Sequence, residues 1–396
     1  MVQAVAVGIV LFTVSWGLLH VSFWQRSQIV DTPVYKNYGD AVMDGEVPYR
    51  DFGLEYPPAA LPVFVLPALA RGADYSGAFE LLMWACGIAA IVSLGLALGF
   101  VDAGPARLYA AVGFFALAPL ALGPVILSRF DLWPAALTIA ALAAFLGRRE
   151  RVGFGVLGLA AAAKIYPLVL LPVALAWTAK QRGTRELGIG LAVFAGVVAA
   201  CFLPFLVLAP GGVAHSIGEQ VGRPLQIESL AASLLLAAEQ LGLYEATVTN
   251  SHGSQNLAGQ LPDALATIVT AFQVVAVAAV WALYAARDRG RERLIIAFAA
   301  AVAAFVAFGK VLSPQFLIWL LPLVPAVAGA GGLAAGGVLA VALVTTQLWF
   351  PTRYWDVVAL EPVTWLVFVR DALLVALFAI LIAALSRRGR AGFHSV

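Results

Sequence analysis

The sequence predicts an all-α polytopic membrane protein with a single transmembrane domain over residues 1–396. Of its 396 residues, 62% are hydrophobic and only 12% are charged, and the mean hydropathy is +0.93. Apolar windows recur along the whole chain, and a helix that crosses a bilayer needs about 20 such residues. A water-soluble domain of this size would not carry so much apolar sequence. The net charge of +2 is too small to indicate nucleic acid binding.

Twelve apolar segments predict about 12 transmembrane helices. Six are long enough to cross unaided, at residues 2–24, 79–101, 107–126, 187–208, 262–286 and 363–386. Segments 133–147, 153–164 and 166–179 are shorter, and we expect tilted helices or helices shielded by their neighbours. The stretch 294–350 is interrupted near Lys310 and again by glycines, which predicts three more helices. The first segment lacks a small-residue cleavage site, so we expect a retained helix.

The segment 57–71 decides the topology, because it is apolar but contains four prolines. If it crossed the bilayer, the arginines at 148–151 would face outside and those at 287–293 would face inside. Basic residues concentrate on the cytoplasmic side of membrane proteins, so we expect 57–71 to lie along the outer interface. Both termini and all basic clusters are then cytoplasmic: Arg148, Arg149 and Arg151; Lys180, Arg182 and Arg185; Arg287, Arg289, Arg291 and Arg293; Arg387, Arg388 and Arg390.

This topology gathers the unusual segments on one side of the plasma membrane. The long loops 25–78 and 209–261 both face outward, as do the turns near Ser128, Lys164 and Lys310. We therefore expect a functional site on the outer face.

The first outer loop contains a predicted amphipathic surface helix at 33–44. Apolar residues recur there at helical spacing, Thr32 can cap the helix, Pro33 fits its first turn, and Gly45 can end it. Asp31 then lies where the first transmembrane helix meets the surface helix. A carboxylate at this boundary could take a proton from a hydroxyl acceptor. Alternatively, Asp31 supports the helix N-terminus by capping and through the helix dipole.

Two lysines are candidate phosphate ligands. Lys164 lies between two short helices, and Lys310 follows another helix on the same side. Ionisable residues at membrane depth are costly and are functional candidates by default. Two such cations could hold a phosphate or pyrophosphate and neutralise charge on a leaving group. Alternatively, each lysine pairs with an acidic neighbour or reaches the lipid headgroups.

Further polar residues allow two interpretations each. Arg129 and Asp131 could form a local ion pair or could contact substrate from the second outer loop. His215 and His252 lack a second closely spaced ligand, so we expect solvated histidines and predict no metal site.

Three blocks of sequence carry a family resemblance. They are the loop from Asp31 to Tyr56-Pro57-Pro58, the segment Ala-Ala-Ala-Lys164-Ile-Tyr166-Pro167, and Ser313-Pro-Gln315-Phe-Leu-Ile-Trp319 followed by Pro322. In their order and their shared outer placement they resemble the polyprenol-phosphate-mannose-dependent mannosyltransferases of glycosyltransferase family 87, within the GT-C superfamily. The resemblance extends over roughly residues 1–350.

The resemblance implies a GT-C fold, with juxtamembrane helices on the outer face, and an inverting sugar transfer. It implies that Asp31 is the general base, that the donor is a polyprenyl-phosphate-linked sugar, most simply mannose, and that the acceptor is a lipid or glycolipid. The other roles are our own inference. We assign Lys164 and Lys310 to the leaving phosphate, and we expect contacts with the donor or acceptor from Tyr35, Tyr56, Arg129, Asp131, Tyr166 and Gln315.

No Asp-x-Asp pair occurs in the first outer loop, so we expect neither a metal nor another cofactor. Two alternative functions remain open. One is a related transferase that uses another lipid-linked sugar, such as arabinofuranose or glucose. The other is a transporter or flippase of lipid-linked sugars. Transporters usually show repeated halves with broken helices that meet at the bilayer midplane, whereas the polar residues here cluster on the outer side, which favours transfer.

Overall fold

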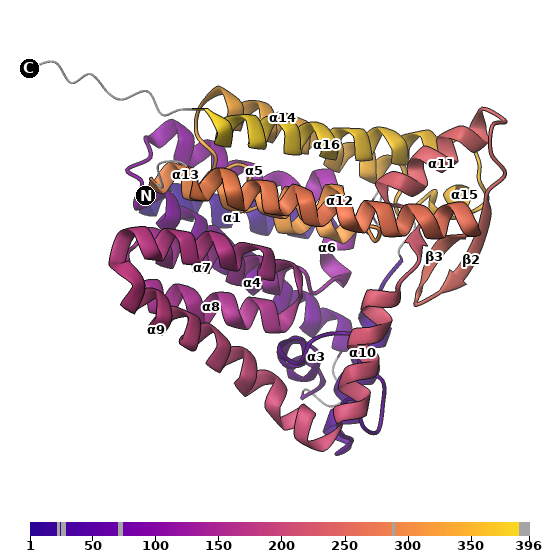
Figure 1. The fold of residues 1–396 in the computed structure, drawn as a ribbon, viewed down its shortest axis with the longest axis horizontal. Coiled ribbons are helices and arrows are strands. Elements are labelled where there is room, and N and C mark those ends of the chain that lie inside the picture. The colour runs from indigo at the N-terminus through magenta and orange to yellow at the C-terminus, as the bar shows by residue number, and fades with distance from the viewer. Residues whose placement is uncertain (22–23, 25–28, 70–73, 287–289, 388–396) are drawn as a thin grey trace, which may run out of the picture.

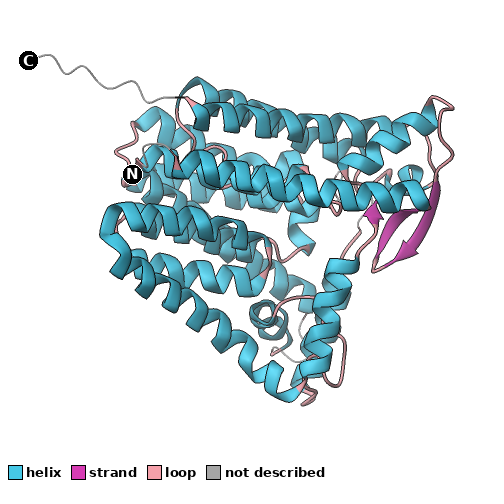
Figure 2. Cartoon of the chain, in the orientation of Figure 1, coloured by secondary structure: helices cyan, strands magenta, loops and turns pink. Residues whose placement is uncertain are grey.

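The computed structural model describes residues 1–21, 24, 29–69, 74–286 and 290–387. Most helices run side by side along the horizontal axis of Figure 1, and strands occur only in a small sheet at one end (Figure 2). The predicted all-α polytopic fold is confirmed. Of the basic residues assigned to the cytoplasm, Arg287, Arg289, Arg388 and Arg390 lie outside the described part of the chain.

The bundle contains ten long helices within the described residues. They are α1 (Val2–Leu18), α4 (Tyr75–Gly99), α5 (Pro105–Leu122), α7 (Leu132–Leu146), α8 (Glu150–Ala163), α9 (Leu171–Leu208), α12 (Gln260–Ala285), α13 (Arg291–Ala307), α14 (Gly329–Trp349) and α16 (Thr364–Ser386). Six stretches, with α9 counted from Tyr166, are long and apolar enough to cross a membrane. Gly183, at φ 81° and ψ −179°, divides α9 into two helices, as the predicted segments 166–179 and 187–208 require.

The prediction of a middle helix within 294–350 is wrong. Between α13 and α14 the chain forms a 3₁₀ segment, η3 (Pro314–Leu320), and a series of turns. Prolines within this stretch remove backbone donors and prevent a continuous α-helix. The segment still runs the length of the bundle, because Ala326 accepts a hydrogen bond from Arg107 at 2.5 Å, at the end where α13 begins. Irregular backbone is tolerated at membrane depth when protein surrounds it, and residues 317–324 are buried.

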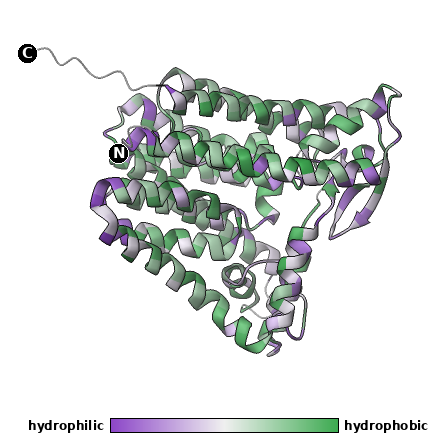
Figure 3. Ribbon diagram, in the orientation of Figure 1, coloured by the Kyte–Doolittle hydropathy of each residue, from purple (hydrophilic) through white to green (hydrophobic). Residues whose placement is uncertain are grey.

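The basic clusters that the structure describes gather at one end of the bundle, which we call the basic end. Arg107 binds Glu292 at 2.6 Å, and Arg291 donates to the carbonyl of Phe100 at 2.8 Å. In the same region, Arg182 of α9 pairs with Glu150 at 3.0 Å. Figure 3 shows hydrophilic residues at this left-hand end and hydrophobic residues along the helices. The opposite end carries Asp31, Lys164 and Lys310, and we call it the site end.

Two short helices cover the site end. The surface helix α2 (Thr32–Met43) closely matches its prediction, and Gly45 follows it at φ 91°. After the 3₁₀ turn η1 (Pro58–Ala60), helix α3 (Leu61–Ala68) is seen end-on in Figure 1, across the direction of the bundle. A Cβ on Gly39 of α2 would lie 2.4 Å from the Phe64 carbonyl of α3, so the two helices are in close contact. The described part of 57–71 therefore lies across the direction of the bundle, as predicted. Residues 70 and 71 are not among the described residues.

The expected outer loop 209–261 is a folded unit instead. It contains α10 (Pro210–Gly222), β1 (Leu225–Gln226), α11 (Leu230–Gln240), β2 (Thr247–Ser251) and β3 (Ser254–Ala258). The antiparallel sheet has the order β1-β3-β2. His252 and Gly253 join β2 to β3, both with positive φ, as a tight hairpin turn requires. Two short helices, α6 (Val125–Ser128) and α15 (Tyr354–Val358), complete the site end.

Candidate functional site

Asp31 forms an ion pair across the site end with Arg129, which lies between α6 and α7. Arg129 also has a long contact, 3.4 Å, with the carbonyl of Ile29. One turn along α2, the Tyr35 hydroxyl donates to Asp31 Oδ2 at 3.4 Å. Asp31 is the N-cap residue of α2, but its side chain makes no capping bond. Its carboxylate is 26% exposed, so it is open to a substrate from one side.

Lys164 and Asp131 form the second ion pair of the site. Lys164 ends α8, and its Nζ lies 2.5 Å from Asp131 Oδ1. The indole Nε1 of Trp319, from η3, donates to the same oxygen at 2.6 Å. Asp131 is 1% exposed whereas Lys164 is 14% exposed. Asp131 therefore holds Lys164 from the protein side, and the ammonium is the member of the pair that a ligand can reach.

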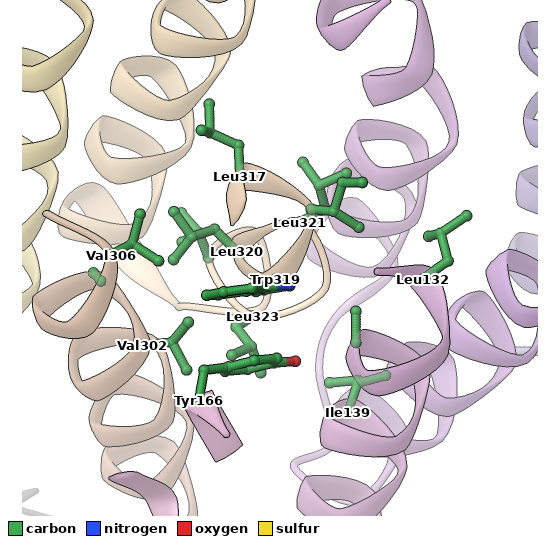
Figure 4. Close-up of a cluster of buried hydrophobic side chains, with 14 of the residues drawn as sticks. Leu132, Ile139, Tyr166, Val302, Val306, Leu317, Trp319, Leu320, Leu321 and Leu323 are labelled. Carbon is green, nitrogen blue, oxygen red and sulfur yellow. The ribbon is translucent and has the colours of Figure 1, made fainter. Parts of the chain in front are cut away.

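Two stacked aromatic rings, those of Trp319 and Tyr166, support this pair. The Trp319 ring stacks on Tyr166 with centroids 4.2 Å apart, and Figure 4 shows both rings with their polar ends pointing the same way. The Tyr166 hydroxyl reaches Thr138 of α7 at 2.9 Å. Because both rings are fixed to α7 through these polar atoms, Trp319 presents its N–H to Asp131 in one orientation.

An aromatic wall joins the two ion pairs. Phe130 lies between Arg129 and Asp131 in sequence, and its ring centroid is 4.4 Å from Lys164 Nζ. Tyr56 packs edge-on against Phe130 at 4.8 Å, and Tyr35 does so at 5.8 Å. An ammonium over an aromatic face is stabilised by the ring quadrupole. Through Tyr35 and Phe130, the wall therefore connects the surroundings of Asp31 with those of Lys164.

Two more cations, Lys310 and Arg223, lie near the end of α10. Lys310 donates to the carbonyl of Val221 at 2.8 Å, and Arg223, just after α10, donates to Ser254 of the hairpin at 3.0 Å. Burial lowers the pKa of Lys310, and the charge of Arg223 lowers it further. Burial also lowers the pKa of Arg223, while Glu55 opposes this change. These two cations repel each other and would be stabilised by an anion.

An apolar hollow of about 400 Å³ opens beside the site between η1, α3, α8 and α9. Its lining residues are Pro58, Ala59, Leu61, Pro62, Val65, Leu159, Cys201 and Phe205. Ala59 also packs against Ala162 and Ala163, and the next residue is Lys164. The indole of Trp133 donates to the Ala59 carbonyl at 3.1 Å and holds this wall in place. An apolar chain in the hollow would thus end close to the ammonium.

A buried polar network fixes the loop between β1 and α11. Arg370 of α16 pairs with Asp371 at 2.6 Å and donates to the Glu228 carbonyl at 2.7 Å. The Gln226 amide donates both to Glu228 Oε2, at 2.5 Å, and to Ser313, at 2.9 Å. Burial raises the pKa of Glu228 to about 7, although Arg370 opposes this shift. The network ties the folded unit at 209–261 to α16 and to the segment before η3.

The structure brings together only part of the predicted site. Asp31, Tyr35 and Arg129 are in contact. The pair Asp131–Lys164 lies beside the aromatic wall, to which Tyr56 belongs. Arg129 and Asp131 do not form a local ion pair, which was one of the two alternatives, since each binds a distant partner.

Three further predicted residues lie elsewhere. Lys310 does not join Lys164, because it is bound to Val221. Tyr166 is 1% exposed and acts beneath Trp319, so it supports the site without facing a ligand. Gln315 is half-buried on η3. Both histidines are exposed, as expected, and His252 also lies 3.4 Å from Glu219.

Sequence reasoning missed four residues near the site. Arg223 and Glu228 lie in a segment expected to be an irregular loop, where charged residues are ordinary. Arg370 and Asp371 carried a usable signal, because charges are rare within an apolar window such as 363–386. Among the described residues, no group of three or more His, Cys, Asp or Glu side chains is arranged to hold a metal.

Comparison with known proteins gives one family match. The model described as Glycosyltransferase family 87 matches residues 54–314. That range includes Tyr56, Arg129, Asp131, Lys164 and Lys310 but begins after Asp31. No curated protein matches the chain.

Two solved structures of ArnT from Cupriavidus metallidurans are similar to the chain. The structure bound to undecaprenyl phosphate shares 16% identity, with a TM-score of 0.48 and coverage of 97% of this chain and 77% of ArnT. For the apo structure these values are 15%, 0.47, 97% and 76%.

Proposed function

The chain belongs to glycosyltransferase family 87, and from this premise we propose that it transfers mannose from a polyprenyl-phosphate-linked donor to a lipid or glycolipid acceptor. It is a multi-pass membrane glycosyltransferase. The observation that carries the finer proposal is the placement of a reachable carboxylate, Asp31, and a reachable ammonium, Lys164, beside one aromatic wall.

In the proposed reaction, Asp31 is the general base. It takes the proton from the acceptor hydroxyl while that oxygen forms a bond to the anomeric carbon of the donor. The bond between this carbon and the phosphate oxygen breaks, and its electron pair leaves with the lipid phosphate. Attack and departure on opposite faces invert the anomeric configuration. The proton on Asp31 is then released to water.

Lys164 is the proposed ligand of the leaving phosphate. Its ammonium would neutralise the charge that grows on the phosphate as the sugar departs, and Asp131 with Trp319 keeps it in position. Cationic side chains thus take the charge-neutralising role, and we propose that no metal or other cofactor is needed. Tyr35, Tyr56 and Gln315 remain proposed contacts for sugar or acceptor hydroxyls, and Arg223 with Lys310 would favour an anionic group at the outer edge.

The apolar hollow supports a lipid-linked donor. An isoprenoid chain lying against Leu159 and Cys201 would exchange lipid contacts for packing against the protein, and its phosphate would lie near the end of α8. We further propose that the site end faces outside, with both termini in the cytoplasm, because the basic end then follows the usual distribution of Lys and Arg.

The test uses a water-soluble, short-chain polyprenyl-phosphate mannose with a labelled sugar, in right-side-out and inverted membrane vesicles. We expect transfer to vesicle lipids in right-side-out vesicles only, with an inverted anomeric configuration in the product. Parallel assays with the arabinose and glucose donors identify the sugar. Transfer only in inverted vesicles would contradict the orientation. Movement of a lipid-linked sugar across the bilayer, without transfer of any of the three, would favour the transporter.

A further inference from the structure

The ion pair between Asp31 and Arg129 conflicts with the role of Asp31 as a free base. A carboxylate next to a guanidinium is stabilised in its charged form, so it is a poor proton acceptor while the pair lasts. A transferase that depends on this carboxylate must break the pair before the acceptor reacts. A group that competes with Asp31 for Arg129 would break it, and this inference rests on the proposed function.

Arg129 has one strong partner that it can give up. Its side chain is 8% exposed, its Nε is buried with no hydrogen-bond partner among the described residues, and its contact with Ile29 is long, at 3.4 Å. The other groups that face it are Asp131, Glu228 and Tyr354.

The two carboxylates among these groups are buried, and one oxygen of each is engaged, whereas Asp131 Oδ2 and Glu228 Oε1 have no hydrogen-bond partner among the described residues. Asp131 accepts hydrogen bonds from Lys164 and Trp319, and Glu228 accepts one from Gln226. Asp31, which is 26% exposed, is therefore the partner that a ligand can displace most directly.

We propose that Arg129 is a catalytic residue that exchanges Asp31 for the phosphate of the donor. Arg129 and Lys164 are neighbours whose charges act on each other, so one phosphate bound beside Phe130 would meet both cations. The planar guanidinium matches two phosphate oxygens better than a single contact with a carboxylate oxygen. The exchange frees Asp31 to accept a proton only when the donor is in place. Arg129 then shares with Lys164 the charge that develops on the leaving phosphate.

The proposal predicts competition between Asp31 and phosphate for Arg129. The measurement is the affinity of the purified protein in nanodiscs for undecaprenyl phosphate, in wild type, Asp31→Asn, Arg129→Gln and the double variant. We expect Asp31→Asn to bind the lipid phosphate about tenfold more tightly than wild type, because no ion pair has to be broken. In the Arg129→Gln background, the same Asp31→Asn change should alter the affinity by less than about twofold.

Simple repulsion between Asp31 and the phosphate would give a different pattern. In that case the gain from Asp31→Asn would persist, or grow, when Arg129 is replaced, and this result would overturn the exchange. Asp44→Asn removes one negative charge from the end of the same helix, away from Arg129, and should leave the affinity unchanged. Arg129→Met removes the same cation and covers the case in which the Gln variant folds poorly; the gain from Asp31→Asn should be lost in that background as well.

The outcomes separate this inference from the proposed function. If wild type transfers a lipid-linked sugar but the Asp31→Asn gain is equal in both backgrounds, the exchange alone is wrong. If no variant binds undecaprenyl phosphate and wild type transfers none of the three sugars, the proposed function fails and the exchange fails with it.

Discussion

Lys164 and Lys310 both follow apolar helices at the site end, yet their surroundings differ. Lys164 faces Asp131 and three aromatic rings at 4.4–5.7 Å, with a fourth at 5.9 Å, whereas Lys310 is bound to a backbone carbonyl. Only Lys164 is held by side chains that fix its orientation toward the aromatic wall. The two lysines, equivalent in the sequence, are therefore expected to contribute unequally.

This difference gives a prediction at the residue scale. Lys164→Gln should lower kcat/KM for the donor by about 100-fold, as expected when one charge-stabilising donor is lost from a reacting centre. Lys310→Gln, the matched control, should lower it much less. Both are measured with the labelled donor at limiting concentration. Equal losses in the two variants would show that the phosphate does not distinguish them, and Lys164 would lose its special role.

The individual candidates could be found from sequence, but their partners could not. Position after the first helix indicated Asp31, and the cost of burying a charge indicated Lys164. Arg129 and Asp131 lie in the connection between α6 and α7, and nothing in that short segment indicates which residues they bind. Their real partners are about 100 and about 30 residues away along the chain, and such distances are set by packing, which local patterns do not encode.

At the scale of elements, the folded unit at 209–261 was the largest failure of sequence reasoning. Its strands have two to five residues, and their side chains are mostly polar, so the alternation that marks a half-buried strand is weak. The pair His252-Gly253 was an available signal for a hairpin turn. The helix predicted in place of η3 was wrong for another reason: the prediction followed the apolar pattern, although the prolines in this stretch argue against a continuous helix.

The packing of α10 against Tyr49 can be tested with two adjacent glycines. A Cβ on Gly212 would lie 1.8 Å from the carbonyl oxygen of Tyr49, whereas a Cβ on Gly211 would meet nothing within 4 Å. Gly212→Ala should therefore destabilise the protein by about 1–3 kcal/mol, as overpacking does. Gly211→Ala should leave the stability unchanged. Thermal unfolding in detergent measures both, and equal stability of the two variants would show that α10 does not pack against Tyr49.

At the scale of the whole molecule, composition and charge were enough to predict the architecture. The apolar windows predicted the long helices, and the arginine clusters predicted which helix ends lie together. Both patterns depend on the bilayer and not on specific contacts. The same charge distribution predicted that 57–71 does not cross the bilayer. Helix α3, in the described part of this segment, lies across the bundle (Figure 1). What the bilayer does not dictate is how loops from distant parts of the chain meet at one end.

The central claim is that Asp31 is the base of a sugar transfer from a lipid phosphate. The most direct measurement compares wild type, Asp31→Asn and Asp44→Asn for transfer of labelled mannose from polyprenyl-phosphate mannose in proteoliposomes. Loss of a general base lowers the rate by about 100- to 10,000-fold, so Asp31→Asn should lose transfer to this extent while Asp44→Asn keeps the wild-type rate. Transfer by Asp31→Asn at the wild-type rate would contradict the account.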